Sequence, residues 1–343
     1  MRRKVKYNAL LLIVLMVVSC GDPKPAPGPD NPSKVNFAKG ADVSWVTQME
    51  KDGVKFYNSQ GKEMECMALL KSLGMDAIRL RVWVNPTGGW NGKEDLIVKA
   101  KRAKALGMRL MIDFHYSDSW ADPGKQNKPA AWVDLPFEEL KGALVSHTID
   151  ILEALKGEGI SPEWVQVGNE TSDGMLWEDG RASVNIKKYT DLHNAGYRAV
   201  KEVFPDSKVI LHIDRGENGT HYNWLLDGMA IYAAQYDIIG MSLYPDPGNW
   251  EYINEACLLN MKALIAKYDK DIMICEVGMS WDKPEICKCF LIDLIDKALE
   301  KTDGRCLGVF YWEPQGFVKW SNYTKAAFNN EGRPTVALDA FKD

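Results

Sequence analysis

Short apolar segments alternate with longer amphipathic segments along this 343-residue chain, from about residue 37 to its end. Eight of the short segments have the length and the apolar content of buried strands. They are Phe37–Ser44, Ala77–Val84, Arg109–His115, Trp164–Gly168, Lys208–Ile213, Ile238–Leu243, Ile272–Val277 and Leu307–Trp312. A segment with helical periodicity follows each of them, near residues 63–73, 94–106, 137–156, 184–204, 222–234, 251–267, 284–300 and 335–342.

This alternation predicts an α/β fold, because strands that are joined by helical crossovers run parallel to one another. Eight strand–helix units are the number that closes a (β/α)8 TIM barrel. Open doubly wound sheets usually have fewer strands and often a glycine-rich phosphate loop, and the sequence contains neither G-x-G-x-x-G nor a P-loop. We therefore expect one domain, a barrel over residues 36–343.

The first 35 residues do not fit the barrel pattern. Four basic residues between positions 2 and 6 precede an unbroken apolar run, Ala9 to Val18, which has the length of a signal-peptide core. Ser19-Cys20-Gly21 follows, and it resembles the processing site of bacterial lipoproteins, in which the cysteine is diacylated. We expect a signal peptide over residues 1–19, then a lipid on Cys20 and a proline-rich tether over residues 20–35. The alternative is an ordinary signal peptide or a short anchor helix.

These expectations predict an extracytoplasmic protein, lipid-anchored to the bacterial (outer) membrane on the cell surface or the periplasmic face. The formal charge of −5 gives no basic excess, so the chain is a poor candidate for nucleic-acid binding. A lipid on Cys20 would account for the odd number of cysteines, which is seven. The other six have spacings that dictate no disulfide pairing, and we expect Cys275 to point toward the helices as a small apolar residue.

Polar residues stand at the carboxyl ends of all eight predicted strands, which is where the active site of such a barrel lies. They include Asp42, Arg79, Arg81, Asp113, His115, Asn169, Glu170, His212, Asp214, Ser242, Tyr244, Glu276 and Glu313. Glu170 and Glu276 follow the fourth and seventh strands. A pair of carboxyl groups, one protonated and one ionised, is the machinery of glycosidic cleavage.

Other residue types support carbohydrate chemistry. Arg79 or Arg81 would keep a neighbouring carboxylate ionised, Tyr244 would hydrogen-bond the nucleophile, and Asn169 would hold a sugar hydroxyl. Six of the twelve tryptophans lie at or after strand ends, where they can stack on sugar rings. These are Trp45, Trp83, Trp90, Trp120, Trp281 and Trp312, whereas we expect packing roles for Trp132, Trp164 and Trp224.

A metal centre is not expected, and neither is a cofactor. Asp113-x-His115 supplies only half of a zinc site, which needs three or four suitable ligands. A metal hydrolase is the alternative interpretation of this motif. The alternative for His115 and His212 is that both form hydrogen bonds inside the protein and do not contact substrate.

Four longer motifs allow a more specific interpretation. They are Gly40-Ala41-Asp42-Val43-Ser44, RLRVWVNP at 79–86, DFHYSDSWADPGKQ at 113–126, and Val167-Gly168-Asn169-Glu170. Together they resemble glycoside hydrolase family 53, the endo-β-1,4-galactanases, over residues 37–342. That family belongs to a clan of retaining barrel glycosidases.

The resemblance implies roles for individual residues. Glu170 would be the general acid/base and Glu276 the nucleophile. The substrate-binding residues would be Asp42, Arg81, His115, Asp118, Trp120, Asn169, Asp214, Tyr244 and Trp312. Some family members have a long calcium-binding loop after the seventh strand, but residues 277–284 lead almost directly into a helix, so no calcium is expected there.

The sequence therefore predicts a monomeric, retaining enzyme that acts on β-1,4-galactan or galactooligosaccharides. Its two carboxyl groups should lie about 5–5.5 Å apart. One alternative is another β-glycanase of the clan, such as a mannanase, xylanase or cellulase. The other is a glycan-binding lipoprotein without catalytic activity.

Overall fold

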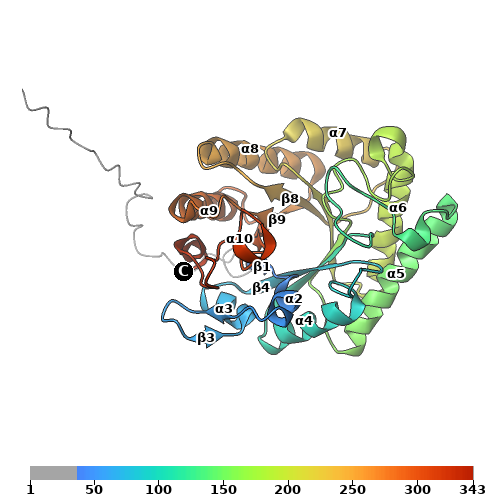
Figure 1. Cartoon of the computed structure of the whole chain (residues 1–343). Helices are drawn as coiled ribbons and strands as arrows, with labels where there is room; N and C mark the ends of the chain where they lie inside the picture. Colours follow the sequence, from blue (N-terminus) through green and yellow to red (C-terminus); the bar gives the residue numbers. More distant parts are fainter. Residues whose placement is uncertain (1–36, 343) are drawn as a thin grey trace, which may run out of the picture. The chain divides into compact units, whose positions relative to one another are not determined.

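The computed structural model describes residues 37–342, and their strands form the closed parallel barrel that the sequence predicts (Figure 1). In chain order the barrel strands are β1 (Ala38–Asp42), β4 (Ala77–Val82), β5 (Arg109–Phe114), β6 (Trp164–Val167), β7 (Lys208–Ile213), β8 (Ile238–Leu243), β9 (Asp271–Val277) and β10 (Cys306–Trp312). Each strand pairs with its neighbours in parallel, and β1 closes the barrel by pairing with both β4 and β10.

Helices surround the barrel, and all eight segments predicted to be helical adopt helical turns. They are α3 (Cys66–Ser72), α4 (Lys93–Ala105), α5 (Phe137–Gly157), α6 (Ala182–Val203), α7 (Gly219–Ala230), α8 (Trp250–Tyr268), α9 (Pro284–Glu300) and the 3-10 helix η2 (Val336–Phe341). Shorter elements decorate the loops: α2 (Val46–Lys51), η1 (Ala130–Trp132), α10 (Val318–Ser321) and a hairpin of β2 (Phe56–Tyr57) with β3 (Glu63–Met64).

The first of these helices starts later than predicted. Residues 63–64 pair with β2, and the helix begins at Cys66 because Glu65 acts as its N-cap. The Glu65 carboxylate accepts a hydrogen bond of 2.7 Å from the backbone N–H of Ala68, which would otherwise lack a partner at the helix start.

The apolar core has two parts. One lies between the strands and the helices, and the other fills the barrel with side chains from all eight strands. The inner part comprises Ala38, Ala77, Met111, Trp164, Ile210, Ile238, Met273, Cys275 and Phe310.

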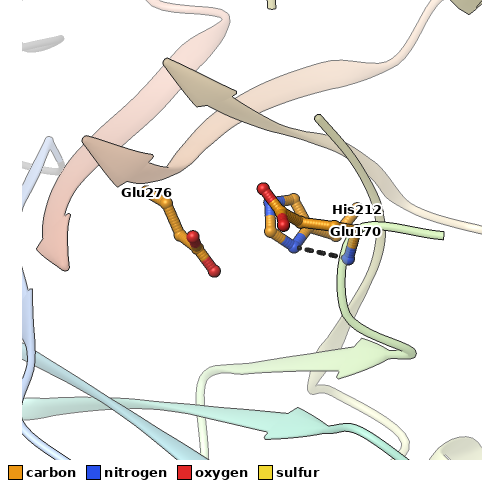
Figure 2. A group of neighbouring side chains, drawn as sticks. All are labelled: Glu170, His212 and Glu276. Atoms are coloured by element: carbon orange, nitrogen blue, oxygen red, sulfur yellow. Dashed lines mark hydrogen bonds between the residues drawn. The ribbon is translucent and has the colours of Figure 1, made fainter. Parts of the chain in front are cut away.

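The prediction that Cys275 points toward the helices is therefore wrong. On the β8 side, Met241 is opposite Ile274 while Ser242 is opposite Glu276, so β9 contains one extra residue at this point. Such a β-bulge changes the alternation of side chains. Cys275 fills the barrel interior, and the next residue, Glu276, is also directed inward (Figure 2).

The predicted signal peptide, the lipidated Cys20 and the tether lie outside the described residues. Among residues 37–342, no helix is both long and apolar enough to cross a membrane.

Candidate active site

Glu170 and Glu276 face each other across the mouth of the barrel (Figure 2). Glu276 is in β9, and Glu170 lies three residues after the end of β6. One carboxylate oxygen of each, together with a ring nitrogen of His212, lies within 4.8 Å of the others. Retaining glycosidases hold their two carboxyl groups about 5–5.5 Å apart, whereas inverting enzymes need about 6.5–9.5 Å for a water molecule. The spacing here fits the first geometry.

Glu276 is buried between one cation and one hydrogen-bond donor. Nη2 of Arg79 lies 2.9 Å from its Oε1, and the Tyr244 hydroxyl donates to its Oε2 at 2.7 Å. Burial raises the pKa of Glu276 to about 7, while Arg79 and Tyr244 act in the opposite direction by stabilising the carboxylate. The sequence prediction that Tyr244 contacts this glutamate matches the geometry.

Within residues 37–342, no cation forms an ion pair with Glu170. Burial of its carboxyl group and repulsion from Glu276 raise its pKa well above the usual value. Its backbone has φ of 44°, in the left-handed region that non-glycine residues rarely adopt, and its N–H donates to Nδ1 of His212 at 3.2 Å. Gly168, two residues earlier, has φ of 92°. This turn directs Glu170 across the barrel mouth, and its environment favours the protonated form.

Of the two arginines in β4, Arg79 contacts Glu276, whereas Arg81, which the family resemblance implied as the substrate-binding arginine, pairs with Glu313. Arg79 is fully buried in β4 and uses its whole guanidinium group. Its partners are Asp42 (2.8 Å), Asp113 (2.9 Å), Asn169 (2.9 Å), Gln166 (2.6 Å) and Glu276 (2.9 Å). Burial opposes its charge, but the surrounding carboxylates hold its pKa well above the usual value.

Three predicted substrate-binding residues lie behind the catalytic pair, bonded to other parts of the protein. Asp42 is fully buried and accepts from Ser44 and Arg79. His115 is buried, with Nε2 beside Asp113 at 3.0 Å and Nδ1 accepting the Ala121 N–H at 3.1 Å. Their polar atoms face protein partners, so the geometry gives these two residues a supporting position rather than a substrate contact.

Asn169, the third of these residues, is also buried. Its Oδ1 accepts from Arg79, and its Nδ2 donates to the Ala121 carbonyl at 2.8 Å. One amide N–H of Asn169 is not used in these two bonds, so a contact with a sugar hydroxyl stays a prediction.

Aromatic side chains line the part of the mouth formed by β10, β1, β4 and the loop after β5. The rings of Trp45, Trp83, Trp120, Trp312 and Tyr323 contact one another edge to face or at a tilt, with centroids 4.8–5.9 Å apart. We call these five residues the aromatic wall. All four of these tryptophans were predicted from the sequence to lie at strand ends, and all four are partly exposed here.

The opposite part of the mouth is polar. A pocket of about 370 Å³ beside Glu170 is formed by the loops after β7 and β8. Its lining residues include Asp214, Arg215, Glu217, Tyr244, Asp246 and Asn249. Asp214 thus lies beside Glu170 as predicted, whereas Asp118 holds two loops together by accepting the N–H groups of Asn85 and Ala130, at 2.9 and 2.8 Å.

The remaining tryptophans divide differently from the prediction. Trp164 fills the barrel interior and Trp132 is buried, so their packing roles are confirmed. Trp224 was also expected to pack inside, but 44% of it is exposed on the outer surface of α7. Trp281 is 37% exposed in the loop after β9.

Glu170, His212 and Glu276 are the one group of potential metal ligands found among the described residues. The hydrogen bonds of His212 do not favour such a role. Its Nδ1 faces the Glu170 N–H and the Gln166 amide at 2.9 Å, and its Nε2 faces the Ser242 hydroxyl at 2.9 Å. A metal ion bound to either ring nitrogen would have to displace these partners. The hydrogen bonds of His212 instead fit a role in positioning the Glu170 backbone.

Several residues of the site were missed by the sequence analysis. Gln166 is buried and binds Arg79, and it was not singled out in the sequence. Glu313 was noted only as a polar residue at a strand end, and its pairing with Arg81 was not predicted. Tyr323 comes from a loop after α10, where no periodicity marks it. For Gln166 there was a signal: a polar residue inside the otherwise apolar strand β6 must find a buried partner.

Comparisons with known proteins agree with this geometry. The profile of Glycosyl hydrolase family 53 matches residues 38–289. An endo-beta-1,4-galactanase from Bacillus subtilis is 33% identical, over 81% of this chain and 70% of its own length. An arabinogalactan endo-beta-1,4-galactanase from Thermothelomyces thermophilus is 31% identical, over 89% of this chain and 98% of its own length. The solved catalytic domain of a family 53 protein from Ignisphaera aggregans superimposes with a TM-score of 0.83 and 29% identity, covering 93% of this chain and 98% of that domain.

Proposed function

The chain belongs to glycosyl hydrolase family 53, and from this premise we propose that it cleaves internal β-1,4 linkages of galactan or arabinogalactan with retention of configuration. The observation on which this rests is the carboxyl pair itself. The two glutamates have oxygens within 4.8 Å of each other, and among the described residues Glu276 is the one of the two with an ion pair to a cation, Arg79. The Tyr244 hydroxyl also donates to Glu276.

The difference between the two environments supports different roles for the two glutamates. Arg79 and Tyr244 stabilise the ionised form of Glu276, which suits a nucleophile. Glu170 is kept protonated by burial and by the charge of Glu276, which suits a general acid. The same charge loses its effect once Glu276 is esterified, so Glu170 then becomes a stronger acid and its carboxylate a competent base.

The reaction follows from these roles in two steps. In the first, Glu276 forms a bond to the anomeric carbon while the glycosidic C–O bond breaks, and the Glu170 proton passes to the departing oxygen. In the second, Glu170 removes a proton from water, the water oxygen attacks the anomeric carbon, and Glu276 leaves as a carboxylate. Two inversions at one carbon give net retention.

The substrate assignment is supported by the relatives, whose names specify galactan and arabinogalactan. The cleft is compatible with an uncharged glycan, because the pocket beside Glu170 contains Asp214, Glu217 and Asp246. These carboxylates would repel a polyanionic chain. The competing substrates are other β-glycans, such as mannan, xylan or cellulose.

The decisive experiment incubates the purified protein with β-1,4-galactan, mannan, xylan and cellulose and follows product size over time. We expect early accumulation of medium-length oligosaccharides from galactan, and NMR should detect the β-anomer first. Oligosaccharides released only from another glycan would contradict galactan as the substrate. An α-anomer formed first would contradict retention of configuration.

Variants of the two glutamates test the roles. Glu276→Ala and Glu170→Ala should each lower turnover by about 1,000-fold or more, while Glu163→Gln at the opposite end of the barrel should not. Azide fits the space left by either carboxylate. It should give an α-glycosyl azide with Glu276→Ala and a β-glycosyl azide with Glu170→Ala, and the reverse pattern would exchange the roles.

We also propose that the enzyme is a lipoprotein on the extracytoplasmic side of a bacterial membrane, as the residues around Cys20 suggest. Metabolic labelling with a fatty acid should label the wild type in the membrane fraction. Cys20→Ala should lose the label, and a labelled Cys20→Ala protein would contradict the proposal.

A further inference from the structure

Arg81 has a burial and a contact pattern that the catalytic mechanism does not explain. The residue is fully buried in β4, two positions after Arg79, and its Nη1 is ion-paired to Oε1 of Glu313 at 2.5 Å. Its Nε and Nη2 are also buried but have no hydrogen-bond partner among the described residues. Leaving two buried nitrogens, with three N–H groups, without hydrogen bonds is costly, so another interaction must compensate.

The compensating groups are indole rings. The guanidinium carbon of Arg81 lies 4.3 Å from the ring centroid of Trp120, and 5.4, 5.5 and 5.9 Å from those of Trp45, Trp83 and Trp312. A cation within about 6 Å of an aromatic ring is attracted by its electrons. One buried charge thus contacts four of the five members of the aromatic wall.

Glu313 completes the arrangement from the other side. Its carboxylate accepts the backbone N–H of Trp45 at 3.1 Å and the side-chain amide of Gln315 at 2.5 Å. Together with Asp42, whose Oδ1 lies 3.7 Å from Nη1 of Arg81, Glu313 offsets the charge of the buried guanidinium. The pair therefore fixes both the rings and the backbone of the wall.

The wall lies on the nucleophile's side of the cleft. Trp312 ends β10, which pairs directly with the strand of Glu276, and Trp45, Trp120 and Trp312 are partly exposed. The sugars that would reach these rings are those on the glycone side of the cleaved bond.

We propose that Arg81, with Glu313, is a positioning residue that holds Trp45, Trp120 and Trp312 in the arrangement that binds the glycone. The identity of the bound sugar in this inference rests on the proposed function. The packing of the rings around Arg81 does not depend on that function. Loss of the charge pair should weaken substrate binding and leave the chemical step nearly intact, because neither residue contacts Glu170 or Glu276.

The test compares two double variants. Arg81→Met/Glu313→Gln removes both charges, so that neither is left buried alone. The control is Arg109→Met/Glu163→Gln, which removes a similar unit at the opposite end of the barrel, where Arg109 lies 4.4 Å from the Trp164 ring and pairs with Glu163 at 2.6 Å. Steady-state kinetics on galactan and near-ultraviolet circular dichroism are measured for both.

We expect KM to rise about tenfold and kcat to change less than about threefold in the first variant, with an unchanged pH profile. The contribution of Trp45, Trp120 and Trp312 to the near-ultraviolet circular dichroism should also change in this variant. The same contribution should stay unchanged in the control variant. An unchanged KM, or a loss confined to kcat, would overturn the inference.

If the double variant does not fold, Arg81→Lys replaces it, because a point charge cannot contact four rings at once. It should also raise KM selectively, and a wild-type KM would overturn the inference. Wild-type protein that fails to cleave galactan would instead reject the proposed substrate, while the dichroism would still test the arrangement of the rings.

Discussion

Nη2 of Arg79 lies 2.9 Å from Oε1 of Glu276, and the same nitrogen is 2.9 Å from Asp113. One guanidinium therefore connects Glu276, the proposed nucleophile, to the buried polar network at the barrel centre. This network also includes Asp42, Gln166 and Asn169.

Replacing Arg79 tests this connection. In Arg79→Lys, one ammonium cannot reach all five partners, so we expect kcat/KM to fall about 100-fold or more. We also expect the acidic limb of its pH profile to move to higher pH, because an ammonium that no longer lies 2.9 Å from Glu276 stabilises its carboxylate less. Buried carboxylates left without a partner should lower the free energy of unfolding by about 3 kcal/mol. Arg109→Lys is the control, and an unchanged acidic limb would contradict the assignment.

The Tyr244 hydroxyl donates to the ionised form of Glu276 and so lowers the pKa of that carboxyl group. In Tyr244→Phe the pKa should rise, and activity should be lost mainly at low pH, where more Glu276 becomes protonated. A shift of roughly half a unit to one unit in the acidic limb of kcat/KM is expected. Tyr197→Phe, which alters a tyrosine that contacts Asp237 at 3.4 Å, should leave the limb in place.

The charge of Glu276 contributes to the raised pKa of Glu170. Glu276→Gln removes this charge and keeps the side-chain volume, so the pKa of Glu170 should fall. Carbon-13 NMR titration of labelled glutamate, with Glu170→Gln used to assign the signal, measures the change. A pKa that stays constant would mean that burial alone protonates the acid.

His193 should make the fold sensitive to acid. It is fully buried in α6, and burial lowers its pKa from 6.5 to about 4. Above pH 6.5 both folded and unfolded states are neutral. As the pH falls from 6.5 toward 4, His193 binds a proton in the unfolded state but not in the folded state. The free energy of unfolding therefore falls, by about 2 kcal/mol at pH 5. In urea unfolding at pH 7.5 and 5, His193→Gln should lose correspondingly less stability than the wild type.

The turn that carries Glu170 depends on Gly168. A Cβ at this position would lie 2.4 Å from Cγ2 of Thr171, and φ is 92°. Gly168→Ala should lower both the melting temperature and kcat, with a loss of about 1–3 kcal/mol. Gly142→Ala, in the middle of α5 with nothing near its Cβ, should be neutral or slightly stabilising.

The sequence predicted the barrel well, because hydrophobic periodicity decides which segments are strands and helices. The strands Lys208–Ile213 and Ile238–Leu243 match residue by residue. It also identified both glutamates and Tyr244, since residues at the carboxyl ends of barrel strands converge on one site. These features depend on local pattern and on strand order.

Other features depend on three-dimensional register. Arg79 and Arg81 occupy the same face of β4, so alternation alone cannot tell which one reaches Glu276. The barrel pairs Arg79 with Met111 and Arg81 with Asp113, a relation set by strand stagger. Cys275 was misplaced for a similar reason, because the extra residue in β9 has no signature in the sequence. Trp224 was misplaced because an exposed aromatic residue on a helix looks the same in sequence as a buried one.

The extra residue in β9 has a consequence for how this enzyme can diversify. Loops after the strands can change in length without moving the barrel, and so can alter which glycans fit. Adding or deleting one residue between Asp271 and Glu276 would instead turn the Glu276 side chain toward the helix layer. Grafted or recombined versions of this barrel should therefore tolerate new loops freely but preserve the length of this single strand.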